Sequence, residues 1–477
     1  MSFSPKVSRI AQLMRLTQGA CMCPAHMGGV VSRHLPNCKS AKSVKSFASQ
    51  MKPEYAFEMA SSNIRYGEGV TREVGMDAKN LGAKKVLVFT DPNIAKLQPF
   101  KTVIQSLEAN GVPYKVYDTV RAEPSDKSFK DAIDFTRKNG VDLFIAVGGG
   151  STIDTAKAAN LYNSYPEADF LDFVNAPIGK GLSISKTLTP LIAIPTTAGT
   201  GSETTGTAIF DFKDIKVKTG IANRALKPML GIVDPLNIRT APVNIQISAG
   251  LDVLFHSVES YTAIPYNQRG PAPANPLERP AYQGSNPISD VWSRKALAMT
   301  IESLPKIKKD PNDTAAQSQM ILAATYAGIG FGNAGVHLCH GMSYPISGLN
   351  KGYLHPEYNV DHPLIPHGVS VAITAPAVFN FTSAMFPDRH LEIAKAFGAD
   401  ISNVKRADIG KVLSDKIKEF LMNLDIPNGI SAFGYTSSDI DALVTGTLPQ
   451  HRVTKLAPVK TEAEDLARLF ENSMKLY

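Results

Sequence analysis

Between residues 54 and about 240, short apolar runs alternate with helical patterns, and this alternation constrains the fold more than any other feature. Four runs of five or six residues, bounded by Gly, Asp or Pro, are candidates for buried strands. They lie at 85–90, 112–117, 143–147 and 191–195, with helical patterns at 100–109 and 128–138 between them. The alternation of strands and helices predicts a parallel, doubly wound sheet. Its edge strands are expected near 207–212 and 230–233.

After about residue 240 helical periodicity replaces the strand-like runs. Apolar residues recur every three or four positions from Ile409 to Leu424, and Thr461 with Glu464 forms a capping-box pattern before a final helix. Two stretches interrupt the helices: 262–290 holds six prolines, and 350–366 is rich in Gly, Pro, Tyr and His. We expect both to be loops that shape a substrate site.

The net charge of +7 comes from the start of the chain. Residues 1–53 contain eight Lys or Arg and no Asp or Glu, so the remaining residues are close to neutral. A basic, acid-free N-terminus with apolar residues among its arginines is typical of a mitochondrial transit peptide. We therefore predict a transit peptide at residues 1–50 and a location in the mitochondrial matrix. A disordered basic arm or a plastid transit peptide would have a similar composition.

This charge distribution argues against a nucleic-acid partner, because the excess of cations is confined to the predicted transit peptide. No apolar run of about 18 residues is present, so no membrane span is expected. Three of the four cysteines lie in the basic segment, and Cys339 is left without a partner for an intramolecular disulfide.

Two glycine- and hydroxyl-rich loops follow predicted strands. The first continues the strand at 143–147 with Gly149, Gly150 and Ser151 and then opens a helix that contains Asp154. Glycines let the backbone approach a ligand closely, and a helix N-terminus offers free N–H groups to an anion. The second loop follows the strand at 191–195. Two such loops in one α/β domain indicate a nucleotide site. The first loop matches neither of the common phosphate-binding motifs, and both loops could also be tight turns.

Asp91 follows the strand at 85–90. An acid just past the end of a strand can bind the adenosine ribose hydroxyls of NAD. In this position it could equally cap the helix that starts at Pro92.

Asp252 and His256 are spaced by four residues, which places both side chains on one face of a helix. Glu259 follows on the same face and could orient a ligand. Further imidazoles come from His337, His340 and His367. One Asp and three His would form an O/N₃ set suited to Fe²⁺, Zn²⁺ or Ni²⁺.

The runs VGGGSTID, IPTTAGTGSE, GLDVLFHSVE and the later HG and PHG pairs resemble the iron-containing (group III) alcohol dehydrogenase family. The resemblance extends from about Phe57 to the C-terminus. It implies a Rossmann-like α/β domain at 51–240 that binds the dinucleotide and an all-α, dehydroquinate synthase-like domain at 241–477 that binds the metal and carries out catalysis.

The resemblance also implies roles for individual residues. The family's metal ligands match Asp252, His256, His340 and His367, with His340 preferred over His337 because Pro345 follows it at the family's spacing. The nucleotide-contacting residues match Asp91, Gly149, Gly150, Ser151, Asp154, Thr196, Thr197, Thr200 and Lys218. Ordinary members have a second histidine where this chain has Tyr344, which we also place among the catalytic residues. A phenol can donate a hydrogen bond or relay a proton, but it is a poor base near neutral pH.

Within the family, the run GVHLCHGMSYPISG and the Pro-rich insert resemble a branch that transfers hydride between small acids. The resemblance implies that NAD stays tightly bound, takes a hydride from a hydroxyacid such as 4-hydroxybutyrate to give succinate semialdehyde, and passes it to 2-oxoglutarate to give 2-hydroxyglutarate. A divalent metal, Fe²⁺ or Zn²⁺, would activate the substrate hydroxyl. The expected assembly is a homo-oligomer such as a dimer.

Two other functions remain open from the sequence. One is an NAD-dependent metal alcohol dehydrogenase that exchanges its cofactor at each turnover. The other is a metal-dependent lyase on the same scaffold, whose phosphate-bearing substrate would call for a basic cluster near the metal. Because carboxylate substrates need a cationic partner, Arg269 and Arg279 of the Pro-rich insert are candidates for that role, with solvated loop charges as the alternative.

Overall fold

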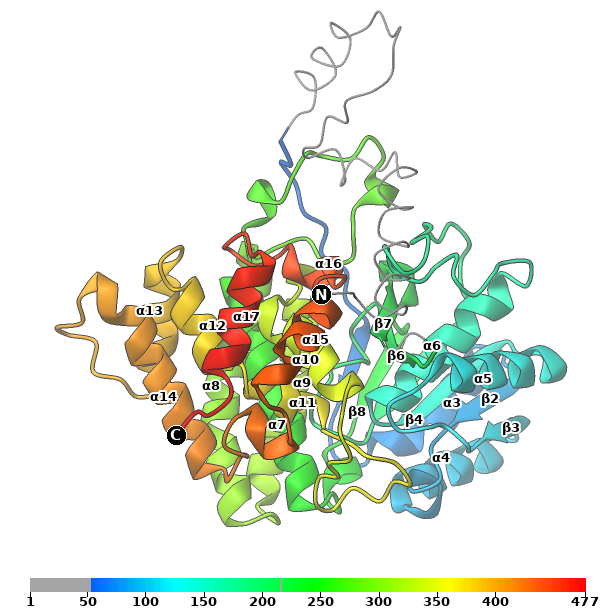
Figure 1. Ribbon diagram of the computed structural model, residues 1–477. Helices are drawn as coiled ribbons and strands as arrows, with labels where there is room; N and C mark the ends of the chain where they lie inside the picture. Colours follow the sequence, from blue (N-terminus) through cyan, green and yellow to red (C-terminus); the bar gives the residue numbers. More distant parts are fainter. Residues whose placement is uncertain (1–52, 215–216) are drawn as a thin grey trace, which may run out of the picture.

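The computed structural model describes residues 53–214 and 217–477. Its first half is built around a six-stranded parallel sheet in the order β1–β8–β5–β4–β2–β3. The strands are β1 (Asn63–Tyr66), β2 (Val86–Phe89), β3 (Tyr114–Tyr117), β4 (Leu143–Gly148), β5 (Leu191–Pro195) and β8 (Leu230–Val233). Figure 1 shows the sheet and its helices on one side of the molecule and the helical part on the other.

Helices cover both faces of this sheet because its central strands are apolar at every position. Val86 and Val88 of β2 pack with residues of α3 and α4, whereas Leu87 and Phe89 pack on the opposite face with residues of α5 and α6. These helices are α3 (Val74–Asn80), α4 (Gln98–Ala109), α5 (Asp126–Asn139) and α6 (Gly150–Ser164). The predicted α/β architecture is confirmed.

The prediction of the sheet edges is wrong. β8 lies between β1 and β5, and β1, which the sequence did not reveal, forms the edge beside it. The run at 207–212 is β6 (Thr207–Phe212), which pairs antiparallel with β7 (Val217–Ala222) in a separate two-stranded sheet. A short apolar run indicates a strand but not its neighbours, since pairing is decided by tertiary packing.

The strand order places a switch point between β2 and β4. From β2 the chain moves outward to β3, and from β4 it moves in the other direction to β5 and β8. In open α/β sheets, ligands bind beyond the carboxyl ends of the strands at such a point. The segments that begin there are Asp91 after β2 and Gly149 after β4.

The second half is helical. After Val233, the only β-pairing among the described residues consists of isolated bridges. Its helices are α7 (Val243–Thr262), α8 (Pro287–Lys309), α9 (Thr314–Ala334), α10 (Leu338–Gly348), α11 (His367–Ala372), α12 (Ala375–Thr382), α13 (Pro387–Ala396), α14 (Ile409–Asn423), α15 (Ile440–Thr447), α16 (His451–Thr454) and α17 (Ala463–Asn472). A large apolar core that includes Leu251, Phe255 and Phe379 joins α7 to its neighbours. The predicted helical part is confirmed, whereas the division of the chain into domains at residues 240 and 241 stays a prediction.

Two local predictions need adjustment. The capping box of α17 is formed by Glu462 and Asp465, one residue later than the predicted Thr461 and Glu464 pair. The predicted loop at 262–290 is mostly irregular, with two short 3₁₀ turns, and it ends where Asn286 caps α8.

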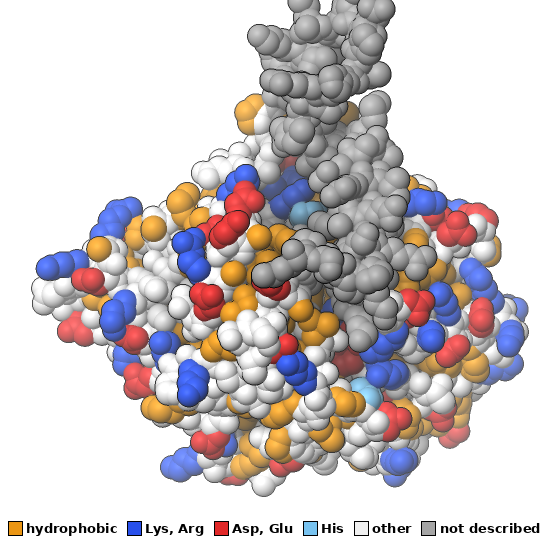
Figure 2. Space-filling view, viewed as in Figure 1, with side chains coloured by type: hydrophobic (Ala, Val, Ile, Leu, Met, Phe, Trp, Pro, Cys, Tyr) orange, Lys and Arg blue, Asp and Glu red, His pale blue; other side chains and the backbone are white. Residues whose placement is uncertain are grey.

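The predicted transit peptide at residues 1–50 lies outside the described residues. In the part of the chain that is described, no helix combines the length and apolar character that a membrane crossing requires. Figure 2 shows basic and acidic side chains interspersed over the visible described surface, in keeping with the near-neutral charge of this part of the chain.

Candidate active site

Helix α7 holds the predicted Asp–His pair inside the protein. Asp252 and His256 are both buried, and Asp252 Oδ1 lies 3.5 Å from His256 Nε2. The two residues are one helical turn apart, so both side chains leave the helix on the same face. The His256 ring stacks on Phe331 of α9 with 3.7 Å between ring centroids, which fixes its plane.

Two other helices bring the remaining histidines to Asp252. His340 of α10 places Nε2 3.5 Å from Asp252 Oδ1, and His367, the first residue of α11, places Nε2 3.8 Å from the same oxygen. Ligand atoms of Asp252, His256 and His340 all lie within 4.8 Å of one another. The four residues named from the sequence are therefore gathered around one carboxylate oxygen.

These side chains fit a divalent cation. Asp252 Oδ1 and His340 Nε2 are buried and have no hydrogen-bond partner among the described residues. Buried polar atoms without partners are costly unless a ligand completes them. Although burial opposes ionisation of Asp252, the histidines hold its pKa far below its usual range. Burial lowers the pKa of His256 to about 3 and that of His367 to about 4, so both rings are neutral and can ligate a metal.

Glu259 sits behind this group on α7 and is fully buried. Its Oε2 lies 2.5 Å from His340 Nδ1, and its Oε1 accepts a hydrogen bond of 2.5 Å from the backbone N–H of Cys339. Burial works against the charge of Glu259, but His337 and His340 lower its pKa to about 2. Glu259 is therefore an ionised acceptor that fixes the orientation of the His340 ring.

His337 is not part of the group around Asp252. Its Nε2 is hydrogen-bonded to Thr262 Oγ1 at 2.9 Å, and its Nδ1 lies 3.2 Å from Glu259. The structure thus brings His340 rather than His337 to the carboxylate, as the family spacing implied.

The loop after β4 needs glycine where it meets the second hydroxyl-rich loop. A Cβ atom on Gly150 would lie 2.5 Å from Cγ2 of Thr200, closer than non-bonded carbons approach. Helix α6 begins at Gly150 with Gly149 as its N-cap, so its free N–H groups face the end of the sheet. Ser151 Oγ accepts a hydrogen bond of 3.2 Å from the backbone N–H of Glu123.

The second loop joins the sheet to the helical part. Gly201 has φ +58°, and a Cβ there would lie 2.8 Å from the carbonyl oxygen of Ala324 in α9. Thr196 is buried, and its hydroxyl has no hydrogen-bond partner among the described residues. Thr200 Oγ1 accepts a hydrogen bond from the N–H of Ser202 at 3.2 Å. The loop is therefore closely packed where it passes the start of α6.

Two acids predicted to contact the cofactor have protein partners. Asp154 accepts hydrogen bonds from Ser202 Oγ at 2.6 Å and from the N–H of Ile209 at 2.9 Å. Asp91 Oδ1 accepts from the N–H groups of Asn93 and Ile94, at 2.9 and 3.0 Å, which is the capping arrangement that the sequence left open. Their contact with a cofactor stays a prediction.

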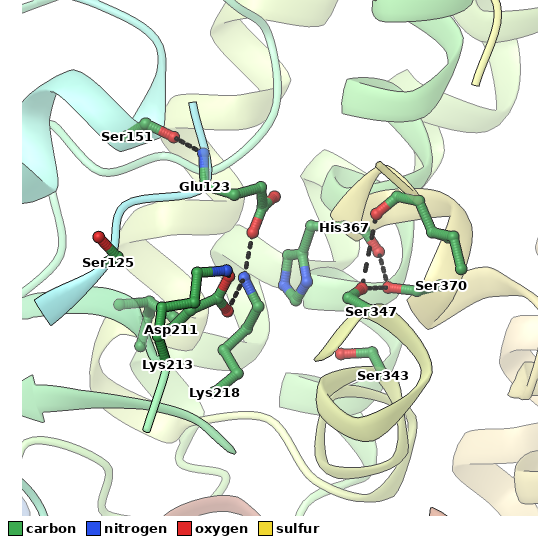
Figure 3. Close-up of polar contacts among 12 residues, drawn as sticks. Glu123, Ser125, Ser151, Asp211, Lys213, Lys218, Ser343, Ser347, His367 and Ser370 are labelled. Atoms are coloured by element: carbon green, nitrogen blue, oxygen red, sulfur yellow. Dashed lines mark hydrogen bonds and ion pairs between the residues drawn. The ribbon is translucent and has the colours of Figure 1, made fainter. Parts of the chain in front are cut away.

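Lys218 lies beside His367 and between two acids, as Figure 3 shows. It forms ion pairs with Glu123 and, at 3.4 Å, with Asp211. Burial opposes the charge of Lys218, but the two acids raise its pKa well above its usual value. Lys218 therefore stays protonated, and its positive charge is already paired with acids of the protein. The nearby hydroxyls in Figure 3 form a separate network in which Ser370 Oγ donates to the carbonyl oxygen of His367 at 2.8 Å.

Tyr344 is buried one turn after His340 on α10. Its ring stacks on His367 with 6.2 Å between centroids, and its hydroxyl accepts a hydrogen bond of 2.5 Å from Nη2 of Arg452. Arg452 belongs to the short helix α16, and its guanidinium lies 5.0 Å from the ring centre of Tyr282. Sequence reasoning missed Arg452 and Tyr282, since neither belongs to a recognisable motif.

One cavity connects these parts. It is lined by the four Asp and His residues, by Tyr344 and Arg452, and by five of the predicted cofactor residues. The five are Gly150, Ser151, Asp154, Thr200 and Lys218, while Asp91, Gly149, Thr196 and Thr197 lie outside its lining. The start of α6 and the Asp–His group therefore open into a common space.

The hypothesis that Arg269 and Arg279 bind substrate does not agree with the structure. Arg269 donates to Glu54 Oε2 at 3.0 Å, and Arg279 donates to both oxygens of the same carboxylate at 3.1 and 3.2 Å. Neither arginine lines the cavity. They anchor the segment around the buried Glu54 and are not free loop charges.

The model for iron-containing alcohol dehydrogenase matches residues 61–235, and the model for the C-terminal part of the Fe-containing alcohol dehydrogenase family matches residues 278–474. The chain belongs to the iron-containing alcohol dehydrogenase family. It is 57% identical over 471 residues to "Hydroxyacid-oxoacid transhydrogenase, mitochondrial" of Bos taurus, covering 98% of this chain and 99% of that protein. The protein of the same name from Homo sapiens is 56% identical with the same coverage.

A solved structure supports the fold. The iron-containing alcohol dehydrogenase from Thermococcus thioreducens has a TM-score of 0.72 and 26% identity, covering 88% of this chain and 99% of that one. Family membership supports NAD and a divalent metal as cofactors, and the two hydroxyl-rich loops and the Asp–His group are the parts of the site that these groups fit.

Proposed function

We propose that the chain is a mitochondrial hydroxyacid–oxoacid transhydrogenase, an oxidoreductase that uses bound NAD and a divalent metal. The observation that carries the proposal is one cavity that joins the N-terminus of α6 to the Asp252 group, in a chain 57% identical to a protein of that name. The first feature suits a cofactor phosphate and the second a metal close to the reacting carbon.

Asp252, His256, His340 and His367 would hold the metal. When bound, the metal supplies Lewis acidity toward a substrate hydroxyl or carbonyl oxygen, and NAD supplies the hydride acceptor. Glu259 keeps the His340 ring oriented so that Nε2 faces the shared centre. We propose Fe²⁺ as the resident ion, although Zn²⁺ would satisfy the same donors.

The neighbouring side chains prepare the cavity for a polar substrate. Lys218 is held by Glu123 and Asp211 and so adds no net positive charge. Tyr344 follows His340 by one helical turn on α10, and its hydroxyl accepts a hydrogen bond from Arg452. In this position the phenol would hold or relay a proton near the reacting oxygen.

The proposed reaction couples two half-reactions at one bound cofactor. 4-Hydroxybutyrate loses a hydride from C4 and a proton from its hydroxyl and leaves as succinate semialdehyde. 2-Oxoglutarate then receives the hydride at C2 and a proton on oxygen, giving 2-hydroxyglutarate. Because NAD is proposed to stay bound, the kinetics would be ping-pong with respect to the two acids.

An assay without added NAD separates this function from its alternatives. A transhydrogenase turns over the two acids without free cofactor, whereas an ordinary alcohol dehydrogenase stops after one equivalent of bound NAD is reduced. A lyase would consume neither of the two acids. Strict dependence of turnover on free NAD would contradict the proposal.

Two further parts of the proposal concern location and assembly. The relatives from Bos taurus and Homo sapiens are named as mitochondrial proteins, and they align over 98% of this chain. We propose that residues 1–50 direct the protein to the matrix, which import of a fusion to a fluorescent protein would test. We also propose a homodimer, which light scattering of the purified protein would test.

A further inference from the structure

Arg452 is a cation of the cavity without an anionic partner. The lining of the cavity includes two Lys or Arg side chains, Lys218 and Arg452. Lys218 is paired with two carboxylates, whereas no described Asp or Glu lies within 4.0 Å of Arg452. Among the described residues, the side chains that the guanidinium contacts are aromatic. Nη2 donates to Tyr344 Oη at 2.5 Å, and the group lies over the ring of Tyr282.

The guanidinium of Arg452 also has an unused donor at its edge. Nη1 of Arg452 is buried and has no hydrogen-bond partner among the described residues. A buried donor of a charged group is costly when it is left unpaired, so a ligand that accepts from it would gain affinity. The planar guanidinium matches a carboxylate particularly well, because two parallel N–H groups can bind its two oxygens.

Helix α10 links Arg452 to the proposed metal ligands through Tyr344. Tyr344, which Arg452 contacts, and the proposed ligand His340 are four residues apart on α10. Four residues of helix rise by about 6 Å. The residue that Arg452 contacts and the proposed ligand therefore come from neighbouring turns of α10, and both line the cavity.

The two proposed substrates share one structural element. In 4-hydroxybutyrate the reacting C4 is separated from the carboxylate by two methylene groups. In 2-oxoglutarate the reacting C2 is separated from the distal carboxylate by two methylene groups as well. A single cation at a fixed distance from the metal can therefore hold both acids in turn, with the same reacting carbon position.

We propose that Arg452 binds the carboxylate that lies two methylene groups from the reacting carbon, and that it serves both half-reactions. This inference rests on the proposed function, since it assigns the residue that selects acid substrates. Tyr282 and Tyr344 are its positioning residues: one lies against the guanidinium and the other fixes Nη2.

The test compares full-length wild type with Arg452→Met, Arg452→Lys and the control Arg468→Met, which removes an exposed arginine of α17. Each protein is assayed with 4-hydroxybutyrate and with its neutral amide, 4-hydroxybutyramide. Arg452→Met is expected to raise KM for the acid about 10- to 100-fold, because a hydrogen-bonded charge pair is lost, and to leave KM for the amide unchanged. Arg452→Lys keeps the charge but lacks the two parallel N–H groups, so its KM for the acid is expected to lie between those of wild type and Arg452→Met. Arg468→Met should match wild type.

A binding measurement provides a readout that does not depend on turnover. Calorimetric titration with glutarate, which is 2-oxoglutarate without its oxo group, is expected to show a similar loss of affinity in Arg452→Met, with retained NAD and metal unchanged by mass spectrometry. Equal losses for acid and amide, or unchanged glutarate binding, would overturn the inference. If Arg452→Met does not fold, Arg452→Lys tests the inference through the same comparison, the ratio of KM for the acid to KM for the amide. A wild type that transfers no hydride between the two acids would instead contradict the proposed function, so the two failures are distinguishable.

Discussion

Glu259 Oε2 lies 2.5 Å from Nδ1 of His340, on the side of the ring opposite to the atom that faces Asp252. Because an ionised carboxylate can only accept, Nδ1 carries a proton, and Nε2 is the ring atom that is left to ligate a metal. One buried acid thus fixes both the tautomer and the orientation of a proposed ligand.

Glu259→Gln should therefore weaken metal binding without removing a ligand. The amide can donate to Nδ1 or accept from it, so the ring tautomer is no longer fixed. We expect a loss of metal affinity of about 10- to 100-fold, measured by competition with a chelator. Glu302→Gln, on the exposed face of α8, is the control; equal affinity in both variants would show that Glu259 does not support the site.

Substitution of the two neighbouring histidines should separate ligand from support. His340→Asn is expected to reduce the metal content of the purified protein to a small fraction, because a nitrogen donor next to Asp252 is lost. His337→Asn should retain the metal, since His337 contacts Thr262 and Glu259 instead. Elemental analysis of both proteins checks the assignment, and a reversed order would assign the ligand to His337.

Gly150→Ala should disturb the contact between the two loops. The added Cβ would meet Thr200 at 2.5 Å, whereas the Cβ of Gly149→Ala would meet Thr197 at an ordinary 3.4 Å. We expect Gly150→Ala to cost about 1–3 kcal/mol of stability and to lower the retained NAD, with a smaller loss of stability in Gly149→Ala. Adding Thr200→Ala to Gly150→Ala should restore much of the stability in denaturant unfolding. Absence of any rescue would refute the proposed clash.

Lys157 gives a pH-dependent prediction away from the proposed metal ligands. It is buried in α6, donates to Ser202 Oγ at 2.7 Å and lies 3.8 Å from Asp154. Burial lowers its pKa to about 8, although Asp154 and Glu203 oppose the shift. Between this value and the ordinary 10.5, the unfolded chain binds more protons than the folded one, so this residue makes the folded state more stable as pH rises.

Wild type should accordingly gain stability relative to Lys157→Met between pH 8 and 10.5. The gain is expected to reach about 3 kcal/mol, and the difference between the two proteins should be constant below that window. Thermal unfolding of both proteins across this pH range measures it. A difference that shrinks as pH rises would show that Lys157 is not held with a lowered pKa.

The sequence predicted those parts of the site that depend on local geometry. Asp252 and His256 are four residues apart in one helix, and a spacing of four places both on one face whatever the rest of the fold. The glycine loop after β4 was visible for a similar reason, because a buried strand that runs into glycines and a helix has few other conformations. Both features are determined by residues that are close together in the sequence, and so they can be predicted from it.

The remaining features depend on tertiary packing. The run at 207–212 reads as a strand, but nothing in it shows that it pairs with β7 outside the main sheet. Arg269 and Arg279 are cations in a predicted loop, but the fold pairs both with the buried Glu54, which lies more than 200 positions earlier in the chain. Arg452 lies on a four-residue helix in a segment without any motif, and only the packing of α16 against α10 brings it to the cavity.

The central claim is direct transfer of hydride between two acids at a cofactor that does not leave. The decisive measurement uses 4-hydroxybutyrate deuterated at C4, 2-oxoglutarate and the purified protein with no added NAD, followed by mass spectrometry of the product. The account predicts 2-hydroxyglutarate that carries one deuterium at C2 over many turnovers. Product that forms only after free NAD is added, with deuterium appearing in released NADH, would contradict it.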